Sequence, residues 1–322
     1  MKFAITLIAV ISMIALSFDD IYLELPDGID REETAAVSAV SVDIVGPLGN
    51  DGNPGRGMVS DVPTDDPLFT AMELNTWQIN GGYAYHALGL EFCYLGGTPV
   101  IAFASNNDDS LYFANVADMT RFNASDLDAS NSSPFGCCVT PPGMTTTDFS
   151  TSSIFTGLWD SWSSYSNPAG NDSRGITSTS GDYLWITRTT GTPDNYVQYL
   201  GRMQEEVPGS IVWYDAGHGL GGTRYLSGLT DFVLYGGNTC LAYVIYNSQW
   251  VRFQEFTGSA IEWLGYADLG LGADAIYGIC YCDSRDSFYV SYLIGSNYYV
   301  SEFSINVTAL NQSTWGEIKS SF

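Results

Sequence analysis

Apolar and polar positions divide most of the chain into short apolar runs separated by polar turns. The clearest example extends from Gly228 to Phe256, where apolar runs at Val233–Tyr235, Cys240–Tyr246 and Trp250–Phe256 are rich in β-branched and aromatic residues. Gly, Asn, Ser and Gln fill the segments between these runs, and such residues favour turns. The pattern predicts a β-meander.

Weaker copies of this meander recur in the same order elsewhere in the chain. Gly96–Phe103 matches Gly236–Tyr243, and the third run, Trp250–Phe253, reappears as Tyr196–Tyr199 and Tyr299–Phe303. A recurring unit that contains several strands is typical of propeller blades.

Tryptophans mark the length of the repeat. Trp162, Trp213, Trp263 and Trp315 lie about fifty residues apart, and Trp77 precedes them. If each tryptophan closes a unit, the chain is an all-β propeller of about five four-stranded blades, in units of about 78–122, 123–162, 163–213, 214–263 and 264–315. A β-sandwich is the alternative, because it also has short strands at regular intervals. No helix longer than a single turn is predicted.

The two ends of the repeat region resemble each other. Leu74–Trp77 and Gln312–Trp315 share a Thr-Trp ending and are expected to occupy equivalent positions. A strand from one end of the chain would then complete the blade begun by the other end, which removes an exposed sheet edge.

The second unit matches the repeat least well. Pro141–Gly143 and Thr145–Thr147 are expected to interrupt regular strands, and Asn123–Ser133 is nearly all small and polar. A surface excursion is predicted in this unit.

The N-terminus has the features of a secretory signal peptide. Lys2 precedes an apolar run at Phe3–Leu16, and the small residues Ala15 and Ser17 precede the expected cleavage site. The run is shorter than the roughly 20 residues that span a bilayer. We therefore expect a secreted or cell-surface protein with no membrane span in the mature chain, divided into a signal peptide (1–17), an extended arm and linker (18–66) and a propeller domain (67–322).

One strand is predicted within the arm. Val40, Val42 and Ile44 alternate with polar residues and give an extended segment one apolar face, and residues 46–66 are dense in Gly, Pro and Asp. The strand has two expected positions, either on its own molecule or on the sheet edge of a neighbouring copy. Head-to-tail repetition of the second contact builds a filament unless the rotation closes a ring.

The chain is strongly acidic because basic residues are scarce. Its formal net charge is −25, and Lys2 and Lys319 are its only lysines. This charge disfavours nucleic acid and anionic membranes as partners.

The cysteines permit two interpretations. An even number in a secreted chain is compatible with disulfides, and free burial as small apolar residues is the alternative. A zinc site is not predicted, because the chain has no pair of CxxC motifs and only two histidines. The candidate disulfide cysteines are Cys93, Cys137, Cys138, Cys240, Cys280 and Cys282.

No catalytic or cofactor-binding motif is present, which favours a protein that is not an enzyme. The chain has no hydrolase elbow, zincin motif or phosphate-binding loop. His86 and His218 are either acid/base groups at equivalent places in two blades or polar residues bonded to backbone. Carboxylates near strand starts are the remaining candidates for the catalytic residues of a glycosidase. They are Glu91, Asp182, Asp215, Asp231 and Asp274.

Three further segments have two interpretations each. Asn106–Asp109 and Asp283–Asp286 offer several oxygen ligands for calcium, but they match no EF-hand and are otherwise solvated hairpin turns. Trp159, Trp162 and Tyr165 either stack on sugars or close a blade.

Five N-x-S/T sequons are candidate glycosylation sites and are expected at the surface. They are headed by Asn123, Asn131, Asn171, Asn306 and Asn311.

These features together predict a secreted, non-enzymatic structural or adhesive protein. It would assemble with copies of itself as a filament or surface-layer subunit linked through its N-terminal strand. The alternative function is a carbohydrate-binding or glycoside-hydrolysing propeller, with glycans as partners.

Overall fold

The structure is a computed structural model that describes residues 22–23, 68–79, 86–141, 143–159, 161–171, 173–179, 182–192, 195–217, 225–233 and 238–306. In these ranges the chain is almost entirely β-structure, and its one helical segment is a 3₁₀ turn at Asp283–Arg285. None of the described residues belongs to a helix long and apolar enough to cross a membrane.

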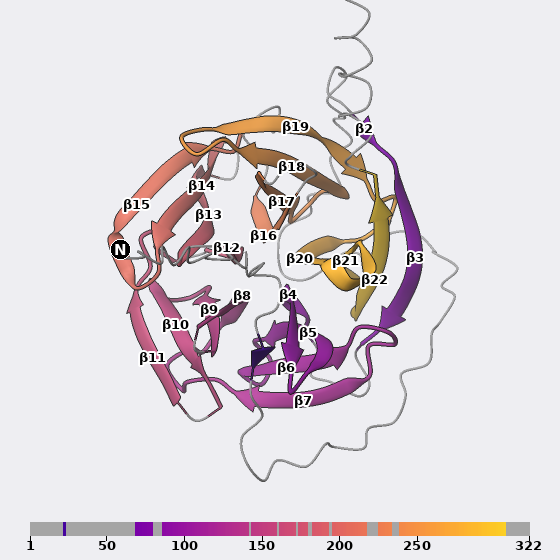
Figure 1. Ribbon diagram of the computed structural model, residues 1–322, viewed down its shortest axis with the longest axis horizontal. Helices are drawn as coiled ribbons and strands as arrows, with labels where there is room; N and C mark the ends of the chain where they lie inside the picture. Colours follow the sequence, from indigo (N-terminus) through magenta and orange to yellow (C-terminus); the bar gives the residue numbers. More distant parts are fainter. Residues whose placement is uncertain are drawn as a thin grey trace, which may run out of the picture.

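Five sheets, each built on four antiparallel strands, surround one axis as the blades of a propeller (Figure 1). This architecture confirms the predicted fold and blade number. Blade 1 contains β4 (Leu88–Leu95), β5 (Thr98–Ser105), β6 (Ser110–Asn115) and β7 (Arg121–Asp126); blade 2 contains β8 (Pro134–Thr140), β9 (Gly143–Asp148), β10 (Ser153–Leu158) and β11 (Ser161–Ser166). Blade 3 contains β12 (Ile176–Thr179), β13 (Tyr183–Thr192), β14 (Asn195–Gln204) and β15 (Val207–Asp215); blade 4 contains β16 (Leu226–Val233), β17 (Thr239–Ile245), β18 (Trp250–Phe256) and β19 (Ile261–Asp268). Blade 5 contains β20 (Ala275–Cys282), β21 (Ser287–Ile294), β22 (Asn297–Ile305) and β3 (Ala71–Gln78).

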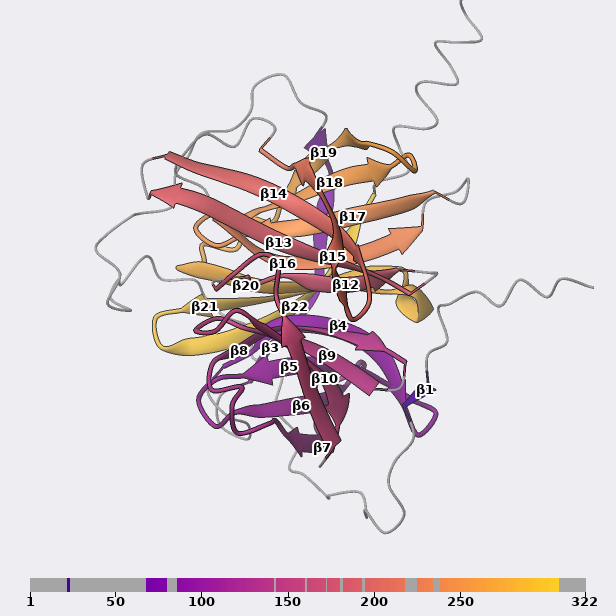
Figure 2. The same ribbon diagram turned by 90° about the vertical axis from the view of Figure 1, so that its left-hand side faces the viewer.

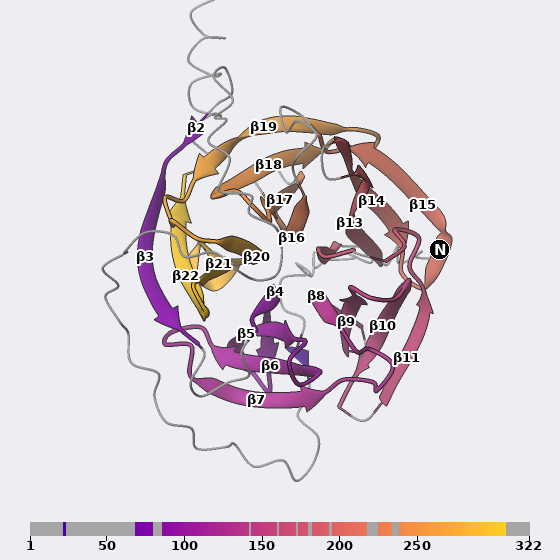
Figure 3. The ribbon, with the colours of Figure 1, turned by 180° about the vertical axis from the view of Figure 1, so that it is seen from behind.

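In every blade the first strand is innermost and the fourth lies at the rim (Figure 3). Trp77, Trp162, Trp213 and Trp263 all lie in rim strands, which explains why they recur once per blade. Blade 1 has no tryptophan in its rim strand β7, and Trp315 lies outside the described residues.

The propeller is closed by a strand from the N-terminal side of the domain. β3 pairs antiparallel with β22 and so completes blade 5, as the likeness between the two chain ends predicted. Buried Glu302 of β22 holds this closure together. Its carboxylate accepts hydrogen bonds from Asn75 Nδ2 (2.7 Å), Arg285 Nε (2.7 Å) and Ser287 Oγ (2.9 Å).

Blade 2 does not contain the predicted excursion. β8 and β9 pair as an ordinary hairpin, and Thr145, Thr146 and Thr147 are fully buried. Their hydroxyls are satisfied locally: Thr145 Oγ1 lies 2.7 Å from Thr140 Oγ1, and Thr147 Oγ1 accepts from the Gly136 N–H at 3.0 Å. The excursion prediction was wrong because paired hydroxyls allow threonine to fill a buried strand.

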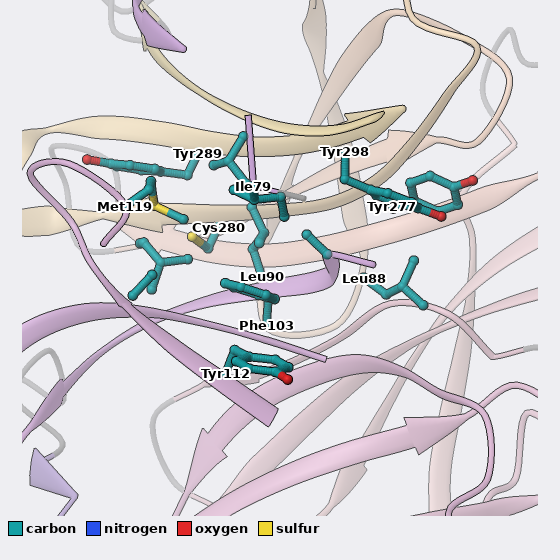
Figure 4. Close-up of a cluster of buried hydrophobic side chains, with 14 of the residues drawn as sticks. Ile79, Leu88, Leu90, Phe103, Tyr112, Met119, Tyr277, Cys280, Tyr289 and Tyr298 are labelled. Carbon is teal, nitrogen blue, oxygen red and sulfur yellow. The ribbon is translucent and has the colours of Figure 1, made fainter. Parts of the chain in front are cut away.

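The hydrophobic core lies between the blades. Five clusters of buried side chains each bridge two adjacent blades. Figure 4 shows the cluster between blades 5 and 1, where Leu90 and Phe103 of blade 1 pack with Tyr277, Cys280 and Tyr298 of blade 5. Each blade is therefore stabilised by its neighbours on both sides.

Two short strands connect the N-terminal region to the propeller. β1 (Tyr22–Leu23) pairs in parallel with β4, opposite Tyr94 and Leu95, and lies near the end of β4 in Figure 2. β2 (Leu68–Phe69) pairs in parallel with rim strand β19. The predicted arm strand at Val40, Val42 and Ile44 lies outside the described residues, as does the signal peptide.

Five glycines lie where the inner strands approach one another most closely, and we call them the glycine ring. A Cβ on Gly89 would lie 2.5 Å from the Phe135 oxygen, and one on Gly228 would lie 2.7 Å from the Gly278 Cα. Neighbouring inner strands therefore pack backbone against backbone, a spacing that other residues do not allow. The ring consists of Gly89, Gly136, Gly175, Gly228 and Gly278.

The glycine ring divides the axis into two ends. At the entry face lie the connections that lead into the inner strands and the turns between second and third strands. At the exit face the inner strands end, and their turns to the second strands follow.

Replacing Gly228 by alanine should destabilise the whole propeller. The new methyl group would lie 2.7 Å from both the Gly278 Cα and the Ile279 nitrogen, and neither backbone atom can move freely. We expect a loss on the order of 1–3 kcal/mol in the free energy of unfolding, as in other overpacked cores. The matched control is Gly209→Ala in β15, where nothing lies within 4 Å of the added methyl group. Equal melting temperatures for the two variants in circular dichroism would contradict the backbone packing.

Candidate functional site

Side chains from all five blades meet at the entry face. The residue directly before each ring glycine lies near the start of an inner strand and therefore at this face. They are Leu88, Phe135, Arg174, Ser227 and Tyr277.

Arg174 lies among four aromatic rings. Its guanidinium carbon is 4.2 Å from the ring centre of Tyr225, 4.9 Å from that of Tyr246, 5.1 Å from that of Phe149 and 5.4 Å from that of Phe135. These distances are within the range of cation–π attraction. Tyr225 and Phe135 are buried, whereas Arg174 and Tyr246 are half-buried and Phe149 is 38% exposed. Part of this arrangement therefore faces solvent.

The aromatic rings continue from Tyr246 towards blade 1. The ring centres of Tyr246 and Tyr277 are 5.6 Å apart, those of Tyr277 and Tyr298 are 5.4 Å apart, and Tyr298 lies 5.0 Å from the His86 ring. Figure 4 shows Tyr277 and Tyr298 side by side. The Tyr277 hydroxyl hydrogen-bonds with both neighbouring tyrosines. We call the whole group the axial aromatic cluster: His86, Phe135, Phe149, Arg174, Tyr225, Tyr246, Tyr277 and Tyr298.

The pKa shifts of two titratable groups in the cluster favour their uncharged forms. Burial, and then the nearby Tyr298 and Tyr246, raise the pKa of Tyr277 above its ordinary value. Burial lowers the pKa of His86, against a smaller opposing effect of Asp108. The His86 Nδ1 is also hydrogen-bonded to Asn106 Oδ1 in the turn after β5.

The chemistry of the axial aromatic cluster is suited to binding. Its exposed ring faces can stack on flat or apolar ligand surfaces, and its neutral hydroxyls can donate and accept hydrogen bonds. The Arg174 guanidinium places one positive charge among these rings. The cluster as defined contains no carboxylate or thiol that could serve as a nucleophile.

At the exit face, Glu91 and Asp231 approach each other from blades 1 and 4. Glu91 Oε1 accepts a hydrogen bond from the Val139 N–H at 3.1 Å, and Asp231 Oδ1 accepts one from the Thr177 hydroxyl at 2.7 Å. Each carboxylate therefore links its inner strand to a neighbouring one. Burial raises the pKa of Glu91 well above its ordinary value, and the charge of Asp231 raises it further.

The other three carboxylates named from the sequence shape turns. Asp215 Oδ1 accepts from the Gly217 N–H at 2.7 Å, and Asp274 Oδ2 accepts from the Gly295 N–H at 2.7 Å. Asp182 lies in the turn after β12 with a positive φ of 60°. Of the five candidates, the structure brings Glu91 and Asp231 together.

All six cysteines are buried and free, so the structure contains none of the disulfides that their even number permits. In the structure the cysteines instead pack as small apolar residues in the core, which was the alternative interpretation. Burial raises the pKa of Cys137 well above its ordinary value, with added effects of Glu91 and Cys93, so this thiol is unreactive.

The candidate calcium segments form turns. Asn106–Asp109 connects β5 to β6, where Asn106 binds His86 and Asp108 accepts from the Tyr112 hydroxyl. Asp283–Asp286 contains the 3₁₀ turn. Among the residues that the structure describes, no three His, Cys, Asp or Glu side chains are arranged to hold a metal ion.

The sequons divide between surface and core. Asn171 and Asn306 are exposed, as expected. The surface prediction is wrong for Asn123 and Asn131, which are buried, and the Asn131 amide donates to Thr146 Oγ1 at 2.8 Å. Asn311 lies outside the described residues.

Trp159, in the turn after β10, and Trp162, in β11, close the junction of blades 1 and 2. The Trp159 ring packs 6.0 Å from that of Phe113, and Trp162 Nε1 donates to the Asp126 oxygen at 3.0 Å. This arrangement fits the blade-closing interpretation. His218, the second histidine, lies outside the described residues.

Of the axial aromatic cluster, the sequence indicated only His86 as a candidate. Arg174 and the aromatic members were missed because they come from loops and strand ends that do not repeat. The available signal was the glycine in segments such as Phe135-Gly136-Cys137 and Tyr277-Gly278-Ile279, which recurs about every 40 to 50 residues. The residue before each such glycine would have led to Arg174.

No family model and no curated protein sequence matches this chain. Among solved structures it is similar to glutaminyl cyclase from Myxococcus xanthus, with a TM-score of 0.48 and 11% identity over 74% of this chain and 97% of that one. It is also similar to the PQQ-bound aldose sugar dehydrogenase from Streptomyces coelicolor (TM-score 0.44, 8% identity, 75% and 100% covered). A third similar structure is an auxiliary nutrient binding protein from Bacteroides ovatus (TM-score 0.37, 12% identity, 73% and 69% covered). Enzymes and a binding protein share this likeness, so it selects no function for this chain.

Glu91→Gln should change how stability depends on pH. A carboxyl group with a raised pKa in the folded state favours its protonated form, so its contribution is present at low pH and is lost as pH rises through the folded-state value. Glutamine cannot ionise and keeps an oxygen for the Val139 N–H. We expect the variant to melt at a higher temperature than the wild type at pH 8 and at a similar temperature near about pH 4, where glutamate is largely protonated.

The control for this experiment is Glu262→Gln in β19, where the side chain is exposed. If the melting temperature of Glu91→Gln equals that of the wild type at every pH, ionisation of Glu91 does not destabilise the folded protein.

Proposed function

We propose that this protein is a secreted, non-catalytic carbohydrate-binding β-propeller whose binding site is the axial aromatic cluster. The observation that carries the proposal is the convergence of six aromatic rings and one arginine from blades 2 to 5, together with His86 next to blade 1, at the entry face. Ligand sites typically combine apolar and aromatic walls with a few placed polar groups.

The cluster offers the two kinds of contact that a sugar needs. A pyranose ring has an apolar face of C–H groups, and the half-buried Tyr246 and the exposed Phe149 offer rings on which such a face can stack. The edge of the pyranose ring carries hydroxyls, which can form hydrogen bonds with the nearby tyrosine hydroxyls. Tyr277 and Tyr298 are buried and hydrogen-bonded beneath, so the site is preorganised.

The test is glycan-array binding by residues 18–322, followed by calorimetry with the best ligand. Tyr246→Ala and Phe149→Ala should each raise Kd about tenfold, which corresponds to about 1.4 kcal/mol. The matched control is Tyr183→Ala at the exit face, a half-buried tyrosine whose ring lies 3.4 Å from the Arg202 guanidinium. Absence of binding across plant, algal and bacterial glycans, or an equal loss in Tyr183→Ala, would overturn the proposal.

Self-assembly through the N-terminal arm is a second candidate function, and the pairing of β1 with β4 favours it. β4 runs to Leu95, six residues past Gly89, whereas the other inner strands end four or five residues past their ring glycines. The end of β4 therefore extends beyond its neighbours and accepts an added strand at Tyr94 and Leu95.

The arm is long enough for this acceptor edge to take Tyr22–Leu23 from a neighbouring copy. Residues 24–67 separate β1 from β2. Fully extended, such a segment spans up to about 150 Å. An exchanged arm would link subunits head to tail, as a filament or a closed ring.

Cysteine cross-linking distinguishes exchange from packing within one chain. Tyr22→Cys and Tyr94→Cys proteins, mixed at high concentration and oxidised, should give a disulfide-linked dimer if arms exchange, because residues 22 and 94 are Cα partners. The double variant should close within one chain if they do not. Each single variant alone is the control, and assembly that persists after deletion of residues 18–66 would refute a role for the arm.

A further inference from the structure

We infer that His86 is a specificity-determining residue of the axial aromatic cluster, and that its Nε2 accepts a hydrogen bond from a hydroxyl group of the bound sugar. The inference rests on the proposed carbohydrate binding and adds the polar contact that selects one ligand hydroxyl.

Asn106 determines which nitrogen of His86 carries the proton. In the turn after β5, the Asn106 Oδ1 atom is the hydrogen-bond partner of His86 Nδ1. A carboxamide oxygen only accepts hydrogen bonds, so Nδ1 carries a hydrogen and donates it. The neutral ring then has its lone pair on Nε2, which accepts a hydrogen bond and cannot donate one.

The Nε2 atom is accessible to a ligand. The imidazole is half-buried, and the Tyr298 ring lies 5.0 Å from it, tilted by 45°. Among the residues that the structure describes, none hydrogen-bonds to Nε2, and this nitrogen is not one of the buried polar atoms that lack a partner. The ring is therefore held in place through Nδ1, while Nε2 can bind a ligand.

Nε2 of His86 differs from the other polar groups of the cluster. The tyrosine hydroxyls both donate and accept hydrogen bonds, the guanidinium of Arg174 only donates, and the phenylalanines do neither. In the cluster as defined, the neutral imidazole alone offers an acceptor that cannot donate. A ligand hydroxyl satisfies this acceptor by donating to it, whereas a fluorine atom in the same place cannot.

The surroundings of His86 favour the neutral ring. Burial lowers its pKa, and the charge of Asp108 opposes this effect to a smaller extent. The titratable groups that face the ring are Asp108, in the turn between β5 and β6, and Tyr298 of β22. Arg174, the charged member of the cluster, stacks on other rings of the cluster. Protonation of His86 as pH falls converts Nε2 into a donor and removes the requirement for a ligand hydroxyl that donates.

The first part of the test determines the tautomer and needs no ligand. The chain contains two histidines, so nuclear magnetic resonance of residues 18–322 with isotopically labelled histidine gives two imidazole spectra. His218→Gln identifies which spectrum belongs to His86. At about pH 8, above the ordinary pKa of histidine, the His86 ring should carry its proton on Nδ1 and none on Nε2. The opposite tautomer overturns the inference.

The second part measures which ligand hydroxyl is required. The probes are the methyl glycosides of glucose, galactose and mannose, and analogues in which one hydroxyl at a time is replaced by fluorine. Calorimetry at about pH 8 should show one position at which fluorine raises Kd at least about tenfold. In His86→Phe, which keeps an aromatic ring beside Tyr298 but has no nitrogen, fluorine at that position should change Kd less than about threefold.

Asn106→Asp tests whether the partner of Nδ1 controls the ring. The new carboxylate still accepts from Nδ1, but its negative charge raises the pKa of His86. As pH is lowered from about 8 to about 4, the fluorine effect should therefore disappear at a higher pH than in the wild type. The matched control is Asn115→Asp, which adds the same charge in the turn between β6 and β7, at the other end of blade 1, and should not move this transition.

The outcomes separate the role of His86 from carbohydrate binding. If these glycosides do not bind, if fluorine has no such effect at any position, or if the effect survives in His86→Phe, the inference is overturned, while binding on the glycan array stands. Failure of the array as well overturns carbohydrate binding itself, whatever the tautomer. Circular dichroism verifies folding, and if His86→Phe does not fold, a pH dependence in Asn106→Asp equal to that of the wild type overturns the inference.

Discussion

Backbone packing at the glycine ring is the constraint on which the rest of this propeller depends. A side chain at any of the five positions would meet the backbone or side chains of its neighbours, so the ring sets the distance between inner strands. That distance in turn fixes how far the blades diverge towards the rim, where large tyrosine, phenylalanine and tryptophan side chains fill the space between them. The two ends of the axis carry different side chains. Aromatic rings and a cation gather at one, and carboxylates that link neighbouring strands lie at the other.

The repeat could be predicted from sequence because it depends on strand and rim positions that every blade must fill. Trp162, Trp213 and Trp263 recur because the fourth strand of each of these blades covers the same kind of interface. The closing strand could be predicted for the same reason, since Trp77 occupies the rim of blade 5. Blade 2 shows where the approach fails. Pattern alone treats Thr145–Thr147 as polar, whereas in the structure their hydroxyls bond to neighbouring groups and the strand is buried.

The candidate site could not be predicted in the same way, because its members are not equivalent by repeat. The place before the ring glycine holds Leu88 in blade 1 and Arg174 in blade 3. Tyr225 and Tyr246 lie in connections whose sequences differ from blade to blade, and only the closed ring brings them to Arg174. A site assembled from five blades carries no local spacing. The residues of the site can be read from the sequence, but only the topology of the fold shows which of them are in contact.

The closure of blade 5 has a consequence for the order in which the protein is made. β3 is synthesised before the first blade, yet its partner β22 is the last of the described strands to be made, and the hydrogen bond from Asn75 to Glu302 joins residues 227 positions apart. Until the C-terminal strands leave the ribosome, β3 has no sheet to join, and blade 1 lacks the neighbour that covers one of its faces. Blades 1 to 4 can form in sequence as they appear, but the circle is completed only by this long-range pairing, which is the kind of contact that slows folding. The nascent propeller is thus an open arc of blades, and the pairing of β3 with β22 in blade 5 closes the ring.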